Sequence, residues 1–146
     1  MHDPWGSHEM TENEIQELID TFIEAARRDR DAGFDGVDLF AAYNCLIDQF
    51  WSNLTNKRTD KWGGSLENRV RFAVEVCEGI RNMAGEDFII GMSVSGAEPV
   101  PGGLSIDDKK EIFAYLDQRK LVDYFSIGFG SYFEPTSSIV PNFHFG

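Results

Sequence analysis

The order of apolar patterns along the chain restricts its fold more than any other feature. Three stretches carry apolar residues at helical spacing, and a short, mostly apolar run typical of a buried strand follows each of them. Helices that alternate with such strands indicate βαβ units and a parallel sheet. The sequence therefore predicts an α/β fold, and either an α/β barrel or a doubly wound sheet fits. No G-x-G-x-x-G fingerprint or Walker loop supports a nucleotide-binding doubly wound sheet.

Each predicted helix begins at a residue that can cap it. Thr11 and Glu14 form the T-x-x-E pattern of a capping box, and this first helix is expected to end near Asp31. Ser65 and Ser105 have hydroxyls suited to the N-caps of the second and third helices. The expected strands are residues 37–40, 88–95 and 122–129, and residues 46–51 form a helical pattern inside the long connection 41–64.

Composition argues against several classes of protein. The formal net charge of −12 at pH 7 repels nucleic-acid backbones and anionic membrane surfaces, so neither partner is expected. No apolar run is long enough for a transmembrane helix, and no signal peptide is recognised. Cys45 and Cys77 lie far apart in sequence, which fits a reducing, cytoplasmic location, and no metal site is expected. Residues 1–146 are expected to be one domain or part of one.

One stretch has an unusually specific pattern. Residues 56–72 read NKRTDKWGGSLENRVRF, which is a polar loop, a double glycine, a serine cap and the first turns of an amphipathic helix. This run resembles the central signature of the Old Yellow Enzyme family of FMN-dependent oxidoreductases, which includes trimethylamine dehydrogenase and bacterial 2,4-dienoyl-CoA reductases. The runs AGFDGV at 32–37, LIDQF at 46–50 and DYFS at 123–126 look like neighbouring family segments. The resemblance extends from about Met10 to the end of the chain.

The resemblance implies a (β/α)8 TIM barrel, of which this chain holds a part. A complete barrel needs about 250 residues, so the chain is expected to be a partial barrel, roughly helix 3 through strand 6, with tails over residues 1–10 and 130–146. In the family, loops after strands seven and eight hold the FMN phosphate, and these lie outside the chain. A three-strand slice leaves two sheet edges unpaired, which favours a homo-oligomer or pairing with the remainder of the barrel.

The resemblance also implies which positions face substrate and flavin. Phe40, Tyr43 and Cys45 stand where family members carry paired histidine or asparagine side chains and a proton-donating tyrosine. Tyr43 and Cys45 are therefore candidate catalytic residues, and Phe40, Tyr43 and Tyr132 are candidates for binding substrate. Ser93 stands where members have an arginine beside the flavin, and is the candidate cofactor contact. Because phenylalanine donates no hydrogen bond and serine carries no cation, the ordinary enone-reductase mechanism is disfavoured.

Several residues admit more than one interpretation. Phe40, Tyr43 and Trp51 either form part of an aromatic cage for an alkylammonium substrate or pack between sheet and helices, and packing is preferred for Trp51. Cys45 is a reactive thiol or, preferably, a small buried side chain, because no base adjoins it. Acidic helix residues are expected to form a solvated face. The most family-like residues are expected to fix the loop and helix start rather than to catalyse: Arg58, Asp60, Glu67, Asn68, Arg69 and Arg71.

The sequence thus predicts a segment of an FMN-dependent NAD(P)H:flavin oxidoreductase. By resemblance, it acts on amines or on enoyl or enone substrates, with hydride transfer through the flavin. A second hypothesis is a non-catalytic, truncated barrel that serves as an interaction or assembly module. A third keeps the flavin chemistry but adapts it to a substrate without a carbonyl oxygen. The expected partners are a small-molecule substrate and either a second copy or the rest of the barrel.

Overall fold

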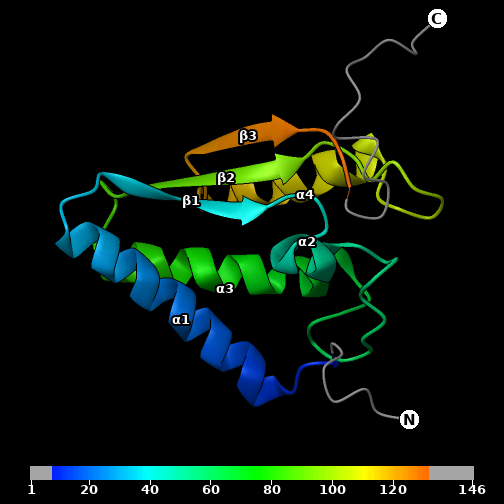
Figure 1. Ribbon diagram of the computed structural model, residues 1–146, viewed down its shortest axis with the longest axis horizontal. Helices are drawn as coiled ribbons and strands as arrows, with labels where there is room; N and C mark the ends of the chain where they lie inside the picture. The colour runs from blue at the N-terminus through cyan, green and yellow to red at the C-terminus, as the bar shows by residue number, and fades with distance from the viewer. Residues whose placement is uncertain (1–7, 132–146) are drawn as a thin grey trace, which may run out of the picture.

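The computed structural model describes residues 8–131, in which helices alternate with parallel strands (Figure 1). The elements are α1 (Glu12–Asp31), β1 (Gly36–Ala41), α2 (Leu46–Trp51), α3 (Leu66–Ala84), β2 (Ile89–Ser95), α4 (Ile106–Gln118) and β3 (Tyr124–Gly128). The strands form one sheet in the order β1-β2-β3, and both pairings are parallel. The predicted α/β architecture is confirmed, and the predicted helices and strands are present within one or two residues of their expected ends.

The helix starts are capped as their sequences predict. Thr11 accepts a hydrogen bond from the Glu14 backbone while Glu14 Oε2 accepts one from the Thr11 backbone, at 3.3 and 2.7 Å. The bond from the Thr11 backbone N–H, followed by hydrogen bonds from the side chains of His8 and Thr11, lowers the pKa of Glu14 to about 2. The Ser65 hydroxyl accepts from the backbone of Asn68 at 3.3 Å. Ser105 caps α4 in a second capping box, in which aspartate takes the place of glutamate.

The hydrophobic core lies between the sheet and the helices, on one face of the sheet. Leu39 of β1 and Met92 of β2 belong to the alternating buried positions that point into it. The aromatic rings of Phe50 in α2 and Phe72 in α3 stack with their centroids 4.8 Å apart. The predicted stripe of α3 is buried along most of its length: Val70, Ala73, Val76, Cys77 and Ile80. This packing anchors the strands and leaves the other face of the sheet open.

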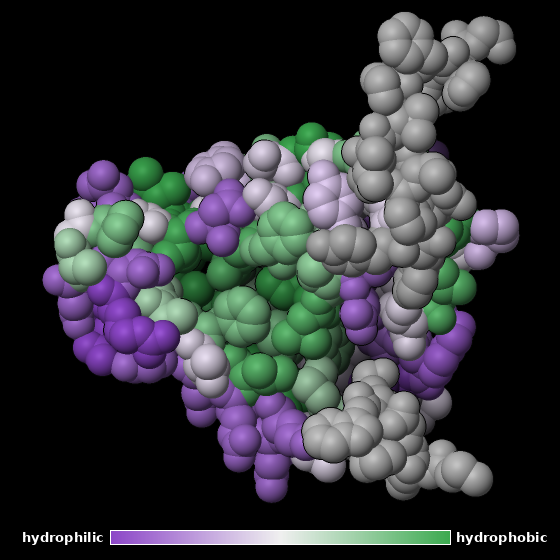
Figure 2. Space-filling model, viewed as in Figure 1, coloured by the Kyte–Doolittle hydropathy of each residue, from purple (hydrophilic) through white to green (hydrophobic). Residues whose placement is uncertain are grey.

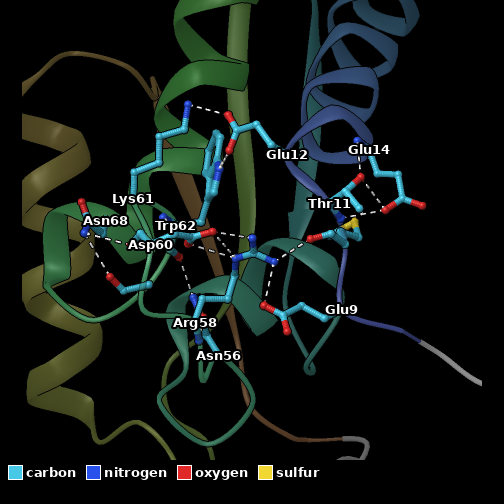
Figure 3. Close-up of polar contacts among 12 residues, drawn as sticks. Glu9, Thr11, Glu12, Glu14, Asn56, Arg58, Asp60, Lys61, Trp62 and Asn68 are labelled. Atoms are coloured by element: carbon cyan, nitrogen blue, oxygen red, sulfur yellow. Dashed lines mark hydrogen bonds and ion pairs between the residues drawn. The ribbon is translucent and has the colours of Figure 1, made fainter.

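The signature loop is held by polar contacts to the start of α1 (Figure 3). Arg58 forms an ion pair with Asp60 at 2.5 Å, and it also donates to the carbonyl of Met10 at 2.7 Å. Trp62 is fully buried, and its ring N–H donates to Glu12 at 2.7 Å. The expectation that the six most family-like residues serve structure is confirmed for their described contacts. Four of the six donate to backbone carbonyls of the loop or of neighbouring segments: Arg58, Asn68, Arg69 and Arg71.

Apolar surface remains on the outside of the molecule. Figure 2 shows hydrophobic residues gathered over the middle of the face that carries β1 and the helices beside it. Large apolar side chains are exposed on or beside the strands, among them Phe40 at 49%, Ile127 at 65% and Phe129 at 54%. β1 and β3 are the two edges of the sheet within residues 8–131. Within the same range, no helix combines the length and the apolar character needed to cross a membrane.

Candidate functional site

The open face of the sheet presents two rows of side chains that run across the three strands. The pairing register aligns Asp38 with Gly91 and Gly91 with Tyr124, which makes the lower row. One step toward the carboxyl ends of the strands, Phe40 is aligned with Ser93 and Ser93 with Ser126, which makes the upper row. In parallel α/β folds, functional groups gather at this carboxyl end. The upper row and the loops beyond it are therefore the candidate site.

A tyrosine that crosses the sheet fills the lower row. The Tyr124 hydroxyl donates to Asp38 Oδ2 at 2.9 Å, and this bond to a carboxylate raises the pKa of Tyr124. The ring passes directly over Gly91, where a Cβ atom would lie 2.1 Å from the ring carbon Cζ. The Ser93 backbone donates to the other oxygen of Asp38 at 3.2 Å. The side chains of Tyr124 and Asp38 therefore cover the lower row of the sheet.

The upper row combines small hydroxyl side chains with aromatic rings. The rings of Phe40 and Tyr43 have centroids 5.9 Å apart and are tilted by 58°. The Tyr43 backbone donates to the Ser95 hydroxyl at 2.8 Å. Its ring extends toward β3, where a Cβ atom added at Gly128 would lie 2.6 Å from the Tyr43 hydroxyl oxygen. Tyr43 thus reaches from the end of β1 to the end of β3, above the serines of the upper row.

A buried polar network lies behind this site, and it is the main feature that the sequence analysis missed. Asp48 and Lys109 form an ion pair that is closed to solvent. Burial raises the pKa of Asp48, although the charge of Lys109 acts in the opposite direction. Glu98, which is 5% exposed, accepts hydrogen bonds from Asn44 and Ser52 at 2.5 and 2.6 Å. The expectation of a solvated acidic helix face is therefore wrong for Asp48, which lies on the apolar side of α2.

The structure separates the remaining candidates. Trp51 is fully buried next to Phe113 and does not join the Phe40–Tyr43 pair, so the packing interpretation preferred for Trp51 is confirmed. Cys45 occupies the N-cap position of α2 and is partly exposed, not the buried side chain that was preferred, and its thiol makes no capping bond. Tyr132 lies outside the described residues. The register aligns Phe40 with Ser93, and the Tyr43 ring lies beside that of Phe40.

Comparison with known proteins gives the family. A parallel α/β arrangement with its candidate site at the strand ends fits either a barrel or a doubly wound sheet. A sequence model of the NADH:flavin oxidoreductase / NADH oxidase family matches residues 2–135. The chain belongs to this family, which confirms the resemblance to the Old Yellow Enzymes.

Individual relatives agree with this assignment. The chain is 46% identical over 133 residues to N,N-dimethylglycine/sarcosine dehydrogenase of Chromohalobacter salexigens, covering 90% of this chain and 19% of that protein. A solved 2-naphthoyl-CoA reductase complex superposes with a TM-score of 0.82 at 41% identity, covering 88% of this chain and 19% of that one. Old Yellow Enzyme from Pichia sp. AKU4542 superposes with a TM-score of 0.72 at 31% identity, covering 82% and 34%. The chain thus spans about a fifth of the first two proteins.

The described residues suit the ring of FMN, the cofactor that the family implies. Ser93 and Ser126 place small hydroxyl side chains on the row that also carries Phe40, so these positions offer a flavin ring hydroxyl contacts without bulk. No side chain of the two rows is cationic, so the group that would pair with a phosphate or an anionic ring is not among them. Over residues 8–131, no three or more His, Cys, Asp or Glu side chains are placed to hold a metal ion.

Proposed function

We propose that the chain is the central part, roughly helix 3 through strand 6, of a barrel that works as an FMN-dependent oxidoreductase with an amine as substrate. Residues 1–146 form a single partial-barrel segment in this proposal. Family membership and the 46% identical dimethylglycine/sarcosine dehydrogenase support flavin-dependent hydride transfer. NAD(P)H is a further electron donor or acceptor that the family name suggests. The hypothesis of a non-catalytic module is not favoured, because the relatives described above are a dehydrogenase and a reductase.

The Phe40–Tyr43 pair is the observation that favours an amine over an enone. A carbonyl substrate needs hydrogen-bond donors at its oxygen, and the ring of Phe40 supplies none. Two aromatic faces at a centroid distance of 5.9 Å instead suit an alkylammonium group, which each face attracts by about 0.5–2 kcal/mol. The half-exposed ring of Phe40 is available for such a contact. An enoyl or enone substrate is the second candidate, because Tyr43 retains a hydroxyl that can donate.

The chain's own residues orient the reactants in this proposal. Phe40 and Tyr43 hold the substrate by its cationic group, and Ser93 offers a hydroxyl to the edge of the flavin ring. When bound, FMN supplies a two-electron acceptor for the hydride that leaves the substrate carbon beside nitrogen. Cys45 adjoins the site at the start of α2, and its thiol is a second candidate for a polar contact with the substrate. The substrate is a small molecule, and assembly with a second copy or with the rest of the barrel is part of the proposal.

The proposal is tested on the intact gene product that carries this chain. We expect a flavin absorption spectrum, anaerobic bleaching by an N-methylated amine, and slow oxidation by cyclohexenone after reduction with NADH. Phe40→Ala should raise KM for the amine about 2- to 30-fold, which corresponds to the cation–π contribution. Phe34→Ala is the matched control, because Phe34 is an exposed phenylalanine that precedes β1. A protein without flavin refutes the proposed function, and unchanged kinetics in Phe40→Ala and Tyr43→Phe refute the amine site.

A further inference from the structure

The chain turns sharply after β1 through two residues in an unfavourable backbone conformation. Tyr43 and Asn44 have φ angles of 55° and 62°, in the left-handed region. This region costs an L-residue about 1–2 kcal/mol, and less for asparagine than for tyrosine. Such a turn persists only where the surrounding structure determines it. Other contacts must therefore hold Tyr43 in this conformation at the candidate site.

Asn44 has all four of its hydrogen-bonding groups engaged, and it is 4% exposed. Its backbone N–H donates to Asp48 Oδ2 at 3.0 Å, and its backbone carbonyl accepts from Gln49 Nε2 at 2.7 Å. Its side-chain Nδ2 donates to Glu98 Oε1 at 2.5 Å, and its Oδ1 accepts from the Ser131 hydroxyl. Buried polar groups that are all satisfied give a well-determined local geometry.

The two partners of the Asn44 side chain follow the other two strands of the sheet. Glu98 lies in the loop after β2, and Ser131 follows β3, whereas Asn44 itself follows β1. The carboxylate of Glu98 is held in turn by the Ser52 hydroxyl at 2.6 Å and the Leu104 backbone at 2.7 Å. Because a carboxylate only accepts hydrogen bonds, it fixes the amide of Asn44 with the nitrogen toward Glu98. One side chain therefore joins the three strand ends at the carboxyl edge of the sheet.

We propose that Asn44 is a positioning residue that holds the ring of Tyr43 beside Phe40 through its amide bonds to Glu98 and Ser131. The consequence for catalysis rests on the proposed function, whereas the consequence for the ring of Tyr43 does not. Without these two bonds, the turn loses the side-chain link from Asn44 to the ends of β2 and β3, so we expect the ring of Tyr43 to shift relative to Phe40 and Gly128. Glu98 and Ser131 act on Tyr43 through their bonds to Asn44.

Asn44→Gly separates positioning from folding. Glycine adopts φ near 62° without strain, so the turn itself is retained, while both amide bonds are lost. Lys120→Gly is the matched control, because Lys120 also has a positive φ, of 55°, but is exposed at the end of α4. Glu98→Ala removes the main anchor of the amide. Glu98→Gln restores it, because a flipped Asn44 amide can pair with glutamine on one side and the Ser131 hydroxyl on the other.

The readout is NMR of the full chain labelled with ring-¹³C tyrosine, with the Tyr43 signal assigned from Tyr43→Phe. We expect this signal to shift or broaden in Asn44→Gly and Glu98→Ala, and to keep its wild-type position in Glu98→Gln and Lys120→Gly. An unshifted Tyr43 signal in folded Asn44→Gly overturns the proposal. If Asn44→Gly does not fold, Ser131→Ala is used instead, because it deletes the hydroxyl that is bonded to the Asn44 amide oxygen. An unshifted Tyr43 signal in Ser131→Ala then overturns the proposal.

Kinetics of the intact gene product provide a second readout. Displacement of a substrate-contacting ring by about 1 Å lowers kcat/KM by up to about a hundredfold, and we expect a loss of about tenfold or more in Asn44→Gly. Lys120→Gly should be indistinguishable from wild type. The NMR measurement needs no flavin. If the protein does not bind flavin, the proposed function is refuted, and the Tyr43 signal still tests the role of Asn44.

Discussion

Replacing Lys109 by methionine should destabilise the fold strongly and in a pH-dependent way. Lys109 and Asp48 are both closed to solvent, and the ammonium also lies 5.2 Å from the centroid of the Trp51 ring. Lys109→Met removes the partner of a buried carboxylate, which costs about 3–5 kcal/mol. A single domain has a total stability of about 5–15 kcal/mol. At about 2–4 °C per kcal/mol, the melting temperature should fall by about 6–20 °C.

The sign of the pH dependence follows from the pKa of Asp48. Burial raises this pKa, and Lys109 partly offsets the rise, so the pKa of Asp48 should be higher still in Lys109→Met. A carboxyl whose pKa is higher in the folded state than in the unfolded state destabilises the fold as the pH rises above the unfolded value, about 3.9. The destabilisation grows until the pH passes the folded-state pKa. The difference between variant and wild type should therefore be small near pH 4 and largest at neutral and alkaline pH.

The assay is urea unfolding followed by circular dichroism and tryptophan fluorescence at a mildly acidic and a mildly alkaline pH. Lys110→Met is the matched control, because Lys110 is exposed and pairs with Asp107 on the surface, where ion pairs contribute about 0–1 kcal/mol. The double variant Lys109→Met/Asp48→Asn should regain much of the lost stability, because it removes the buried charge and keeps an oxygen that accepts from the Asn44 backbone. Equal effects of Lys109→Met and Lys110→Met, or a loss that does not change with pH, would refute this account of the buried pair.

Two further predictions concern the helix layer. Gly79→Ala should lower the free energy of unfolding by up to about 2 kcal/mol in urea titrations, because a Cβ atom at Gly79 would lie 2.1 Å from Cδ1 and 2.7 Å from Cγ1 of Ile23. Overpacking of about 1–3 kcal/mol outweighs the gain of about 1 kcal/mol in helix propensity. In an Ile23→Ala background, which removes both of these atoms, Gly79→Ala should no longer destabilise, and a loss of stability there would contradict close packing of α1 on α3. At pH 8, a thiol reagent should modify Cys45 well before Cys77, because burial raises the pKa of the Cys77 thiol to about 12. Peptide mass spectrometry resolves the two modification rates, and equal rates would contradict the burial of Cys77.

The helices and strands could be predicted because their signals are local. Thr11, Ser65 and Ser105 each stand just before an apolar pattern of helical period, and each proves to be an N-cap. The strands are short apolar runs between such helices, and the open face of the sheet explains why they are not apolar throughout. The positions of Phe40 and Ser93 could be predicted through the family signature, and the parallel register brings the two residues onto one row.

The buried network could not be predicted with the same rules, because its partners are far apart in sequence. Asp48 and Lys109 are separated by 61 positions, and only the folded chain shows that they meet. A signal was nevertheless present, since each charge interrupts an apolar helix face. Lys109 lies three residues before Ile112, on the buried stripe of α4, and Asp48 follows the buried Ile47. A charge on a core stripe should be interpreted as one half of a buried pair rather than as part of a solvated face.

The placement of charge around the site bears on the proposed substrate. The buried charges behind the site already have partners: Lys109 binds Asp48, and Glu98 accepts three hydrogen bonds. On the open face, the carboxylate of Asp38 belongs to the lower row and is bonded to Tyr124 and to the Ser93 backbone. No carboxylate of the two rows is therefore left to form an ion pair with an ammonium group at the upper row. Attraction for a cation must come from ring faces, which favours weakly hydrated, N-alkylated ammonium groups over primary ones. Binding of an ammonium group therefore depends on the orientation of the Tyr43 ring. In our proposal, the amide of Asn44 sets that orientation.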